Sequence, residues 1–482
     1  MSAVSRRGAV LDCRGWGWRY ADRAAWAVSG LDLHIDPGER VLVVGPSGGG
    51  KSTLLAGIAG ILGGDDDGET TGELLVDGAP PHPGSTGLML QNPESQIVMP
   101  TVGDDVAFGC ENLRVPREEI WPRVRSALGA VGLDVPLDRG TQALSGGQQQ
   151  RLALAGLLAM QPALLLCDEP TANLDPQGVR DVCGRVLEAA DRTGATLVVV
   201  EHRVQTWLPH VDRMIVVSGG QLIADGAPRQ VLEREGDALR RAGVWVPGIV
   251  VPRRRGGSGG AALLRAEDVA VGRVPGRPLL TGVDAEFSAG RATALTGRNG
   301  LGKSTLSFSL SGLTPPQAGR VLAERELAGD LSAEPWRWRS RELITRIGTV
   351  FQNPEHQFVA ATVLDELLAG PRAAGAGTDD ARRRAEELLE RLGLAAFAAA
   401  NPYTLSGGEQ RRLSVGTMLS TRPRLLILDE PTFGQDANTW ATLVSLLDEQ
   451  RSAGAGIIAV THDRLFVDTL CDAELECGRW AA

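Results

Sequence analysis

The chain has 482 residues, which is too long for one ordinary hydrophobic core, so two or three domains are expected. Its hydrophobic content of 43% and charged content of 22% are those of a globular protein. The formal net charge of −10 argues against a protein that holds nucleic acid on a basic face.

Apolar runs in the sequence are too short for a membrane-spanning helix, which needs roughly 18 residues. The richest run, Leu152 to Cys167, is interrupted by Gln161 and Pro162. The segment from Met1 to Val10 has no apolar core and does not resemble a signal peptide. The six cysteines form no CxxC pair, which favours reduced thiols over a zinc site or disulfides. We therefore expect a cytoplasmic protein.

The first recognisable element is a short β-branched run, Val41–Val44, that ends at the sequence GPSGGGKST. This pattern, GxxxxGK[ST], predicts a phosphate-binding loop, because its backbone N–H groups and the following helix N-terminus attract phosphate oxygens. The helix is expected over Ser52–Leu62. The residues expected to bind nucleotide here are Gly45, Ser47, Gly48, Gly50, Lys51, Ser52 and Thr53.

Further along the chain, an apolar strand at Ala163–Cys167 ends in Asp168 and Glu169. An acid at this place holds Mg²⁺, directly or through water, together with Ser52 of the phosphate loop. The neighbouring glutamate is placed to polarise the attacking water, and such a base contributes roughly 10²–10⁴ in rate. The sequence thus predicts a hydrolytic phosphate site.

The second half of the chain repeats these motifs in the same order. GPSGGGKST returns as GRNGLGKST, LQNPESQ as FQNPEHQ, LSGGQQQR as LSGGEQRR, and LLLCDEPT as LLILDEPT. Asp429 and Glu430 take the places of Asp168 and Glu169, and Ser304 is the second Mg²⁺-binding serine. The nucleotide-binding residues expected in the second loop are Gly297, Asn299, Gly300, Gly302, Lys303, Ser304 and Thr305.

Each copy is long enough to form a domain of its own. Alternating strands and helices in both copies predict an α/β domain with a largely parallel sheet. We expect domains over 7–242 and 263–482, joined by a flexible linker over 243–262 that is rich in Gly, Pro and Ser. The linker arginines, Arg253–Arg255, are interpreted as solvated, with a phosphate or lipid contact as the alternative.

The text between each phosphate loop and its Asp-Glu strand resembles the LSGGQ signature of ATP-binding cassette (ABC) ATPases. This resemblance covers nearly the whole chain twice. It implies two P-loop NTPase domains of ABC type, each a mainly parallel sheet with helices, a small antiparallel β-subdomain and a helical subdomain. It also implies ATP and Mg²⁺ as cofactors. The signature residues are Ser145, Gly146 and Gly147 in the first cassette and Ser406, Gly407 and Gly408 in the second.

Other positions match the family one by one. Gln91 and Gln352 resemble the glutamine that senses Mg²⁺ and the attacking water. His202 and His462 resemble the switch histidine that contacts the γ-phosphate. In the family two cassettes pair head to tail, which would bring Lys51 opposite Ser406 and Lys303 opposite Ser145. Two competent sites are expected.

Two further family positions show where the halves agree and where they differ. Asp175 and Asp436 resemble the residues that couple the two sites. Tyr20 lies where the family places an aromatic side chain that stacks on adenine, whereas the same count in the second half leads to Gly272, with no aromatic residue nearby. Adenine stacking is therefore expected in the first cassette alone.

The QNPExQ text resembles the ATPases of energy-coupling factor (ECF) transporters, and so does the FGQD text at Phe433–Asp436. This implies an energising subunit for uptake of a vitamin or transition-metal ion, peripheral on the cytoplasmic face of the membrane. Its partners would be a transmembrane coupling protein and a small membrane substrate-capture protein, with no nucleic acid. Ile97–Met99 and Phe358–Ala360 would either contact the coupling protein or fold into the helical subdomain.

Two alternatives remain open. Tandem cassette proteins also act on ribosomes, although the short Gly-rich linker and the acidic composition argue against this role. A sugar-type importer ATPase is closer, and only the QNPExQ text argues against it.

Overall fold

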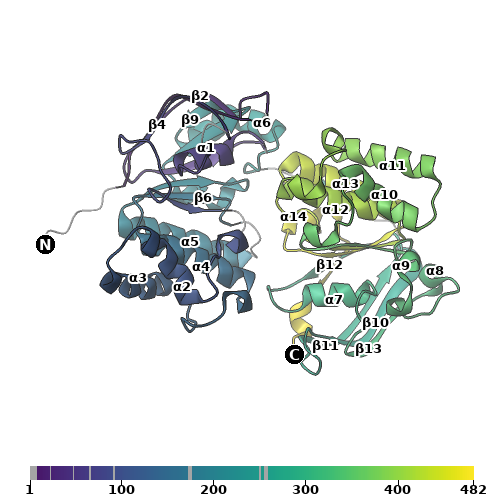
Figure 1. Cartoon of the computed structure of the whole chain (residues 1–482). Coiled ribbons are helices and arrows are strands. Elements are labelled where there is room, and N and C mark those ends of the chain that lie inside the picture. The colour runs from purple at the N-terminus through teal and green to yellow at the C-terminus, as the bar shows by residue number, and fades with distance from the viewer. Residues whose placement is uncertain are drawn as a thin grey trace. The chain divides into compact units, whose positions relative to one another are not determined.

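The computed structural model describes residues 8–21, 23–46, 48–63, 67–90, 93–171, 176–248, 251–254 and 259–482. The chain divides into two compact units, Met1–Ile249 and Val250–Ala482. Figure 1 shows the elements of both, and each unit is described by itself. Both units have a mainly parallel sheet, a small antiparallel sheet and covering helices, which confirms the predicted fold class.

The core sheet of the first unit has six strands in the order β5-β6-β7-β3-β8-β9. All neighbours are parallel except β8 and β9. The strand bounds are β5 (Gly87–Met89), β6 (Leu164–Asp168), β7 (Thr196–Val200), β3 (Arg40–Val44), β8 (Arg213–Ser218) and β9 (Gln221–Gly226).

Alternation along β3 explains why this sheet has a layer on each face. Val41 and Val43 pack in one hydrophobic cluster with the antiparallel sheet and the helix after the phosphate loop. Leu42 and Val44 pack in a second cluster with the helices of the opposite layer. Because successive side chains of a strand point to opposite faces, an uninterrupted apolar run produces a sheet buried on both sides.

The two layers of the first unit are distinct in Figure 1. One layer contains helix α1 (Lys51–Ile58) and the antiparallel sheet β2-β1-β4. The other contains α2 to α5, and α6 follows the last strand. The remaining bounds are β1 (Leu11–Tyr20), β2 (Val28–Ile35), β4 (Gly68–Val76), α2 (Val102–Asn112), α3 (Arg117–Ala130), α4 (Gly146–Met160), α5 (Pro176–Thr193) and α6 (Pro228–Arg241).

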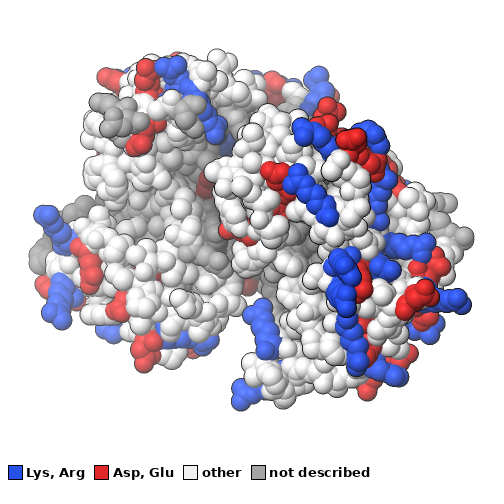
Figure 2. Space-filling model, turned by 45° about the vertical axis from the view of Figure 1, so that its right-hand side comes forward, with Lys and Arg blue, Asp and Glu red and all other residues white. Residues whose placement is uncertain are grey.

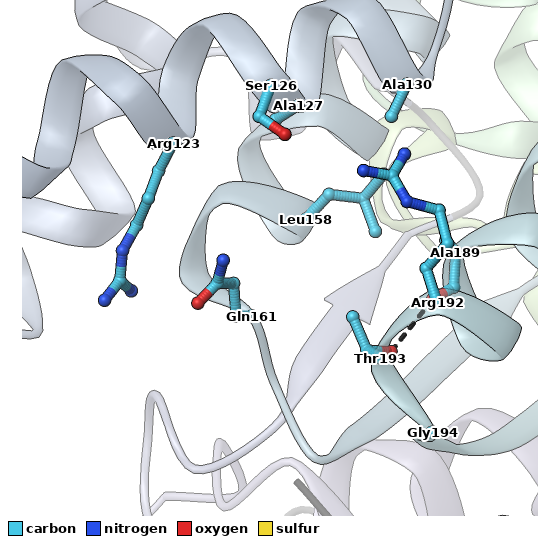
Figure 3. A pocket seen from close by; sticks show the side chains of 10 residues that line it. All are labelled: Arg123, Ser126, Ala127, Ala130, Leu158, Gln161, Ala189, Arg192, Thr193 and Gly194. Atoms are coloured by element: carbon cyan, nitrogen blue, oxygen red, sulfur yellow. Dashed lines mark hydrogen bonds between the residues drawn. The ribbon is translucent and has the colours of Figure 1, made fainter. Parts of the chain in front are cut away.

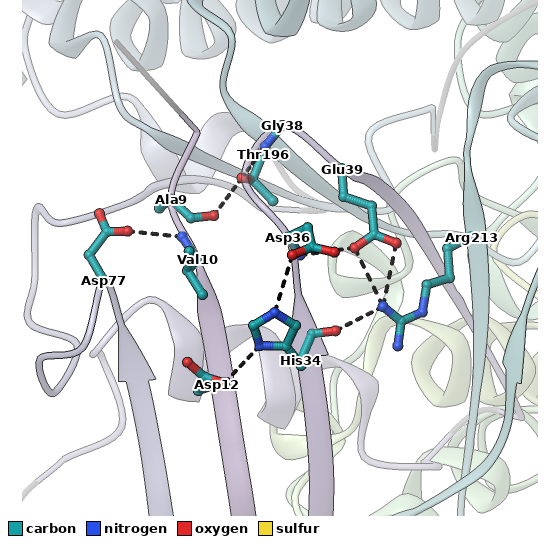
Figure 4. Close-up of polar contacts among 10 residues, drawn as sticks. All are labelled: Ala9, Val10, Asp12, His34, Asp36, Gly38, Glu39, Asp77, Thr196 and Arg213. Atoms are coloured by element: carbon teal, nitrogen blue, oxygen red, sulfur yellow. Dashed lines mark hydrogen bonds and ion pairs between the residues drawn. The ribbon is translucent and has the colours of Figure 1, made fainter. Parts of the chain in front are cut away.

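Polar contacts join the antiparallel sheet of the first unit to its core sheet (Figure 4). The Thr196 hydroxyl donates to the carbonyl of Ala9 at 2.6 Å and accepts the N–H of Gly38 at 2.9 Å. Arg213 on β8 donates to the carbonyl of His34 on β2 at 2.8 Å. These bonds fix the orientation of the antiparallel sheet, which carries Tyr20, relative to the phosphate loop.

The second unit repeats this plan with five parallel core strands in the order β14-β15-β16-β12-β17 and an antiparallel sheet β11-β10-β13. The strand bounds are β14 (Ile347–Val350), β15 (Leu425–Asp429), β16 (Gly456–Val460), β12 (Ala292–Thr296), β17 (Ala473–Glu476), β11 (Leu280–Ser288), β10 (Ala262–Val271) and β13 (Ala318–Ala323). The helix bounds are α7 (Lys303–Leu310), α8 (Arg325–Ala328), α9 (Ser340–Leu343), α10 (Val363–Ala373), α11 (Thr378–Arg391), α12 (Gly407–Ser420), α13 (Ala437–Ser452) and α14 (Arg464–Leu470).

The helices after the phosphate loops are shorter than the sequence predicts. The first ends at Ile58 rather than Leu62. The second, which the sequence predicts over Ser304–Leu313, ends at Leu310. Gly60 and Gly312 follow these ends with φ angles of 68° and 75°. Glycine adopts this left-handed conformation without a Cβ clash, so it terminates a helix readily.

Parts of the predicted linker over 243–262 belong to the folded units. Val244 and Val246 are 1% and 2% exposed and pack in the core of the first unit. Arg254 contacts the second unit, where its backbone N–H donates to the carbonyl of Thr469 at 2.8 Å and its guanidinium bonds Asp448 at 3.1 Å. The linker is therefore shorter than predicted, because its apolar residues pack into the core of the first unit.

Charges of both signs are interspersed over the face of the molecule in Figure 2. Helix α11 shows the arrangement at close range, with Arg382 bonded to Glu386 at 2.9 Å and Arg384 bonded to Glu387 at 3.1 Å. Pairs at this spacing stabilise a helix by roughly 0.2–0.5 kcal/mol each. Within the described residues, no helix is both long and apolar enough to cross a membrane.

Candidate functional site

The first phosphate loop connects the end of β3 to the start of α1, and at both of its ends the backbone leaves no room for a side chain. Gly45 has a φ of 155°, and a Cβ there would lie 1.9 Å from the carbonyl oxygen of Val217. Gly50 has a φ of 101°, and its Cβ would lie 2.4 Å from the carbonyl oxygen of Ala27. The loop conformation thus requires glycine at both ends, and α1 directs its N-terminus at the enclosed space.

Each loop lysine folds back over its own loop. The Lys51 ammonium donates to the carbonyls of Gly45 and Pro46, both at 2.9 Å. The Lys303 ammonium donates to the carbonyls of Gly297 at 2.7 Å and Arg298 at 2.9 Å. Both lysines are buried, so each places a positive charge where phosphate oxygens would enter.

The serine after each lysine meets the strand-end aspartate. Ser52 hydrogen-bonds Asp168, and Ser304 hydrogen-bonds Asp429. Burial raises the pKa of both aspartates above the usual range.

One carboxylate oxygen of each of these aspartates, Asp168 Oδ1 and Asp429 Oδ2, is buried without a hydrogen-bond partner among the described residues. A buried, unpaired carboxylate oxygen beside a hydroxyl is a set of hard oxygen donors that suits Mg²⁺. These residues therefore fit the metal that the phosphate chemistry requires. When bound, Mg²⁺ would neutralise charge on the phosphates.

The glutamate after each aspartate has an unusual backbone. Glu169 and Glu430 have φ angles of 49° and 50°, in the left-handed region that non-glycine residues rarely adopt. Their backbone N–H groups donate to the carbonyls of Val200 at 3.0 Å and Val460 at 2.9 Å, on the neighbouring strand. Backbone strain of this kind is common at functional sites. Here the left-handed conformation ends the strand direction at both glutamates.

Both predicted histidines lie beside these glutamates but make different contacts. His202 Nε2 lies 2.9 Å from Glu169 Oε1. His462 Nε2 lies 2.9 Å from the side-chain oxygen of Asn299 in the phosphate loop, and 3.9 Å from Glu430. The structure thus brings each histidine close to the glutamate of its own unit.

The signature serines stand at the N-termini of the long helices α4 and α12. Ser406 forms a capping box, in which its hydroxyl accepts the N–H of Glu409 and its own N–H donates back to the Glu409 carboxylate at 2.8 Å. Ser145 pairs in the same way with Gln148. A helix N-terminus presents free N–H groups and partial positive charge, which suits an anionic ligand.

Tyr20 lies at the end of β1, close to the helix of the first phosphate loop. Its hydroxyl forms a 3.3 Å hydrogen bond with the hydroxyl of Thr53, and its ring packs edge-on against Trp18. In the second unit, a Cβ at Gly272 would lie 2.4 Å from the carbonyl oxygen of Arg277. The backbone therefore has no room for an aromatic side chain at that position.

Several predicted residues stand apart from these contacts. Ser47, Gln91 and Asp175 lie outside the described residues. The side chain of Gln352 is exposed. Asp436 accepts the N–H of Thr439 at 2.8 Å and so begins helix α13.

Sequence reasoning missed Arg411 in the second signature helix. It is buried, and it donates to the backbone carbonyls of Phe351, Gln352 and Asp429. It thereby joins the QNPExQ loop to the end of β15, and burial lowers its pKa to about 10. The first unit has Gln150 there, which donates to the carbonyl of Pro170. The difference between LSGGEQR and LSGGQQQ was the available signal.

A cavity of about 380 Å³ lies elsewhere in the first unit, among α3, α4 and α5 (Figure 3). Arg123, Gln161 and Arg192 contribute to its wall, and none of the predicted site residues does. It has no part in the phosphate site.

These features define a class of protein: a tandem P-loop nucleotide-binding protein with two sets of phosphate-site residues. The sequence model of the family described as "ABC transporter" matches residues 28–172 and 280–433. The chain therefore belongs to the ABC transporter ATP-binding family, whose members are ATPases that bind and hydrolyse ATP.

Similar proteins extend along nearly the whole chain. A Bacillus subtilis protein named "Putative HMP/thiamine import ATP-binding protein YkoD" is 33% identical over 92% of this chain and 85% of its own length. A "Putative ABC transporter ATP-binding protein" of Caldanaerobacter subterraneus is 32% identical over 90% of this chain and 84% of its own length.

Among solved structures, the archaeal ribosome recycling factor aABCE1, in complex with the stalk protein aP1, covers 98% of this chain and 88% of its own. The TM-score is 0.63 and the identity is 19%. This likeness shows the shared tandem fold.

Proposed function

We propose that the chain is the ATP-hydrolysing, energising subunit of an importer of energy-coupling factor type, which powers uptake of a vitamin or a transition-metal ion. It would lie on the cytoplasmic face of the membrane and bind a transmembrane coupling protein, which in turn binds a small substrate-capture protein. The observation that carries this proposal is a matched pair of exposed valines, one on the QNPExQ loop of each unit.

In the first unit the loop is closed by hydrogen bonds to its own backbone. Gln96 accepts the N–H of Leu90 at 3.0 Å and donates to the carbonyl of Leu88 at 2.8 Å. The carboxylate of Asp105 on α2 accepts the N–H groups of Val98 and Met99 at 2.8 and 2.9 Å. Val98 is left 60% exposed on a segment held at both ends.

The second unit builds the same loop with one main change, the partner of the glutamine amide nitrogen. Gln357 donates to the carbonyl of Ser414 at 3.0 Å, and Glu366 on α10 accepts the N–H groups of Val359 at 2.8 Å and Ala360 at 2.6 Å. Phe358 is 6% exposed, whereas Val359 is 81% exposed. The loop thus buries one apolar side chain and presents the next.

Each of the two interpretations, contact with the coupling protein or folding into the helical subdomain, accounts for some of these side chains. Ile97 packs against the core of the first unit and Phe358 is buried, in line with folding into the subdomain. Val98 and Val359 do not fold in, and a rigid loop with an apolar tip favours a covered contact. We propose that these two valines contact the coupling protein.

We assign the residues of the phosphate sites as follows. Lys51 and Lys303 bind phosphate, the Ser–Asp pairs bind Mg²⁺ together with Gln91 and Gln352, and Glu169 and Glu430 act as bases assisted by His202 and His462. The cassettes would pair head to tail, so that each signature serine completes the opposite site. The supporting observations are the buried lysines, the unpaired aspartate oxygens and the helix N-termini at the signatures.

The names of the sequence relatives support transport over the ribosomal alternative. Relatives that match most of this chain at 32–33% identity are named as ATP-binding proteins of transporters, one of them for HMP/thiamine import. The ribosome factor shares the fold at 19% identity. A vitamin or vitamin precursor is accordingly the first substrate class to test.

The test is membrane recruitment in cells that co-express the coupling protein from an adjacent reading frame. We expect the wild-type chain in the membrane fraction and V98D/V359D outside it, because a charge at an apolar contact is costly. The matched control is I223D, which changes another exposed apolar side chain, 52% exposed, on β9. Equal recruitment of V98D/V359D and wild type, or co-sedimentation of the wild-type chain with ribosomes, would overturn the proposal.

A further inference from the structure

A buried carboxylate stands next to the switch histidine in both units, but on opposite sides of it. In the first unit it is Glu201, directly before His202 and 4% exposed. In the second unit it is Asp463, directly after His462 and 7% exposed. An ionised carboxylate is costly to bury unless donors surround it, so each should have specific partners.

The partners are the same two residue types in both units. Glu201 Oε1 accepts the hydroxyl of Thr171 at 2.5 Å and the indole N–H of Trp207 at 3.4 Å. Asp463 Oδ2 accepts the hydroxyl of Thr432 at 3.0 Å and the indole N–H of Trp440 at 2.7 Å.

The threonines are equivalent, since each ends the DEPT text after the base glutamate, whereas the tryptophans are not. Trp207 follows the switch histidine, and Trp440 lies on α13. The same chemical arrangement is therefore assembled from different positions.

Because the carboxylate lies on opposite sides of the histidine, the residues around it make different contacts in the two units. The position of Glu201 is occupied in the second unit by Thr461, whose hydroxyl donates to Glu430 at 3.0 Å. Asp463 also accepts the N–H groups of Leu465 and Phe466 and so begins helix α14.

In the first unit the residue after the histidine is Arg203, whose guanidinium lies 5.6 Å from the ring centroid of Trp245. Arg203 thus contacts the segment that leads into the linker, and a short 3₁₀ turn, Val204–Thr206, replaces the helix.

Both carboxylates are close enough to the base to interact with it electrostatically. Burial, with a contribution from Glu169, raises the pKa of Glu201 to about 7. Burial, with contributions from Asp429 and Asp463, raises the pKa of Glu430 to about 8. Each carboxylate thus links the DEPT segment to the loop that carries the histidine, and its charge acts on the neighbouring glutamate.

We propose that Glu201 and Asp463 are equivalent positioning residues, which hold the switch histidine and the base glutamate of their own unit by joining the switch loop to the DEPT threonine. The inference rests on the proposed roles of Glu169 and His202. It predicts that ATP hydrolysis requires the carboxylate, and that the carboxylate can stand either directly before or directly after the histidine.

The experiment moves the carboxylate of the full-length chain across the histidine. E201T should lower kcat for phosphate release by at least roughly fivefold with little change in the KM for ATP, because a buried donor loses its acceptor. E201T/R203D, which copies the Thr-His-Asp order of the second unit, should recover most of that loss. R203N, which changes the same position without adding a carboxylate, is the control and should stay close to wild type.

The outcomes separate the alternatives. A merely structural role would lower the melting temperature of E201T without a loss of kcat at a temperature where the variant is folded, and this would overturn the inference. Failure of E201T/R203D to exceed E201T would also overturn it.

If E201T does not fold, the isosteric E201Q takes its place. A wild-type kcat in E201Q would also overturn the inference. If instead E169Q/E430Q still hydrolyses ATP, the proposed bases themselves are wrong, which is a different failure.

Discussion

The two cassettes hold their proposed base glutamates with different neighbours. Glu169 is contacted by the ring of His202, whereas Glu430 accepts the hydroxyl of Thr461 and the backbone N–H of His462. Around the signature helix, Arg411 of the second cassette stands where the first has Gln150.

The backbone around the phosphate loop and the strand-end glutamate, in contrast, is alike in both units. The two glutamates have φ angles within one degree of each other, and each loop lysine bonds the carbonyls of its own loop. The comparison teaches that the two halves share the backbone geometry of the site while the side chains that support it differ. If these side chains matter, the two sites should differ in ATP binding or turnover. Mutations at equivalent positions of the two cassettes test this.

The largest effect should come from the bases. E169Q/E430Q removes both proposed proton acceptors and should lower ATP turnover by roughly 10²–10⁴, leaving ATP bound. Phosphate release and retained nucleotide measure this. The two single variants then show how unequally the sites contribute. Near wild-type hydrolysis by the double variant would contradict the assignment of the base.

The next largest effect concerns the crossed pairing of the cassettes. K51A/S145R should damage both composite sites, whereas K51A/S406R should damage one site twice and spare the other. Nucleotide binding by equilibrium titration should therefore be higher in the second pair. Equal residual binding would count against head-to-tail sites.

A smaller effect is expected at the adenine. Y20A should weaken ATP binding at the first site by roughly tenfold, since stacking on a base is worth ~1–3 kcal/mol. The second site, which has Gly272, should be unaffected. Binding is measured with the other site blocked by a substitution at Lys51 or Lys303.

Y20F is the matched control for this prediction, because it keeps the ring and loses only the hydrogen bond to Thr53. A lower melting temperature of Y20A with unchanged first-site affinity would assign Tyr20 to packing instead.

The smallest effect is a difference in pH response between the antiparallel sheets. His34 pairs across strands with Asp12, at the place where Arg265 pairs with Glu286 in the second unit. The bond to Asp12 raises the pKa of His34 above its usual value. Its contribution to stability is therefore full below the unfolded pKa and is lost as pH rises through the folded pKa.

Hydrogen exchange should show this difference. Between pH ~6 and ~8, amides of β1 and β2 should lose protection by less than ~1 kcal/mol, after correction for intrinsic rates, because solvent screens an exposed pair. Amides of β10 and β11 should not, because Arg265 stays charged. An equal response of the two sheets, or one that persists in H34N, would contradict the prediction.

The sequence predicted the parts of the fold that depend on local patterns. Apolar, β-branched runs such as Val41–Val44 became strands buried on both faces, and the phosphate loops and Asp-Glu strand ends lie together in each unit as expected. These features repeat at matched spacing, and their chemistry is encoded in consecutive residues.

Other features depend on contacts between distant residues, and the sequence did not predict them. Nothing near Glu201 signals that Thr171 and Trp207 will supply its donors, because the three residues meet only after β6 and β7 pair. Val244 was assigned to the linker because the neighbouring Pro and Gly residues dominated the local composition. The core that receives it is formed by elements far away in the chain.

Both ends of the linker are held by the folded units, and this limits how far apart the two halves can move. Val246 is fixed in the core of the first unit and Arg254 is bonded within the second, so eight residue-to-residue steps of chain separate the two anchored points. Such a stretch reaches at most ~28 Å. A tether this short keeps each half at a high effective concentration, on the order of millimolar, as seen by the other. The proposed pairing of the halves should then be independent of how much protein the cell makes, unlike that of two separate chains.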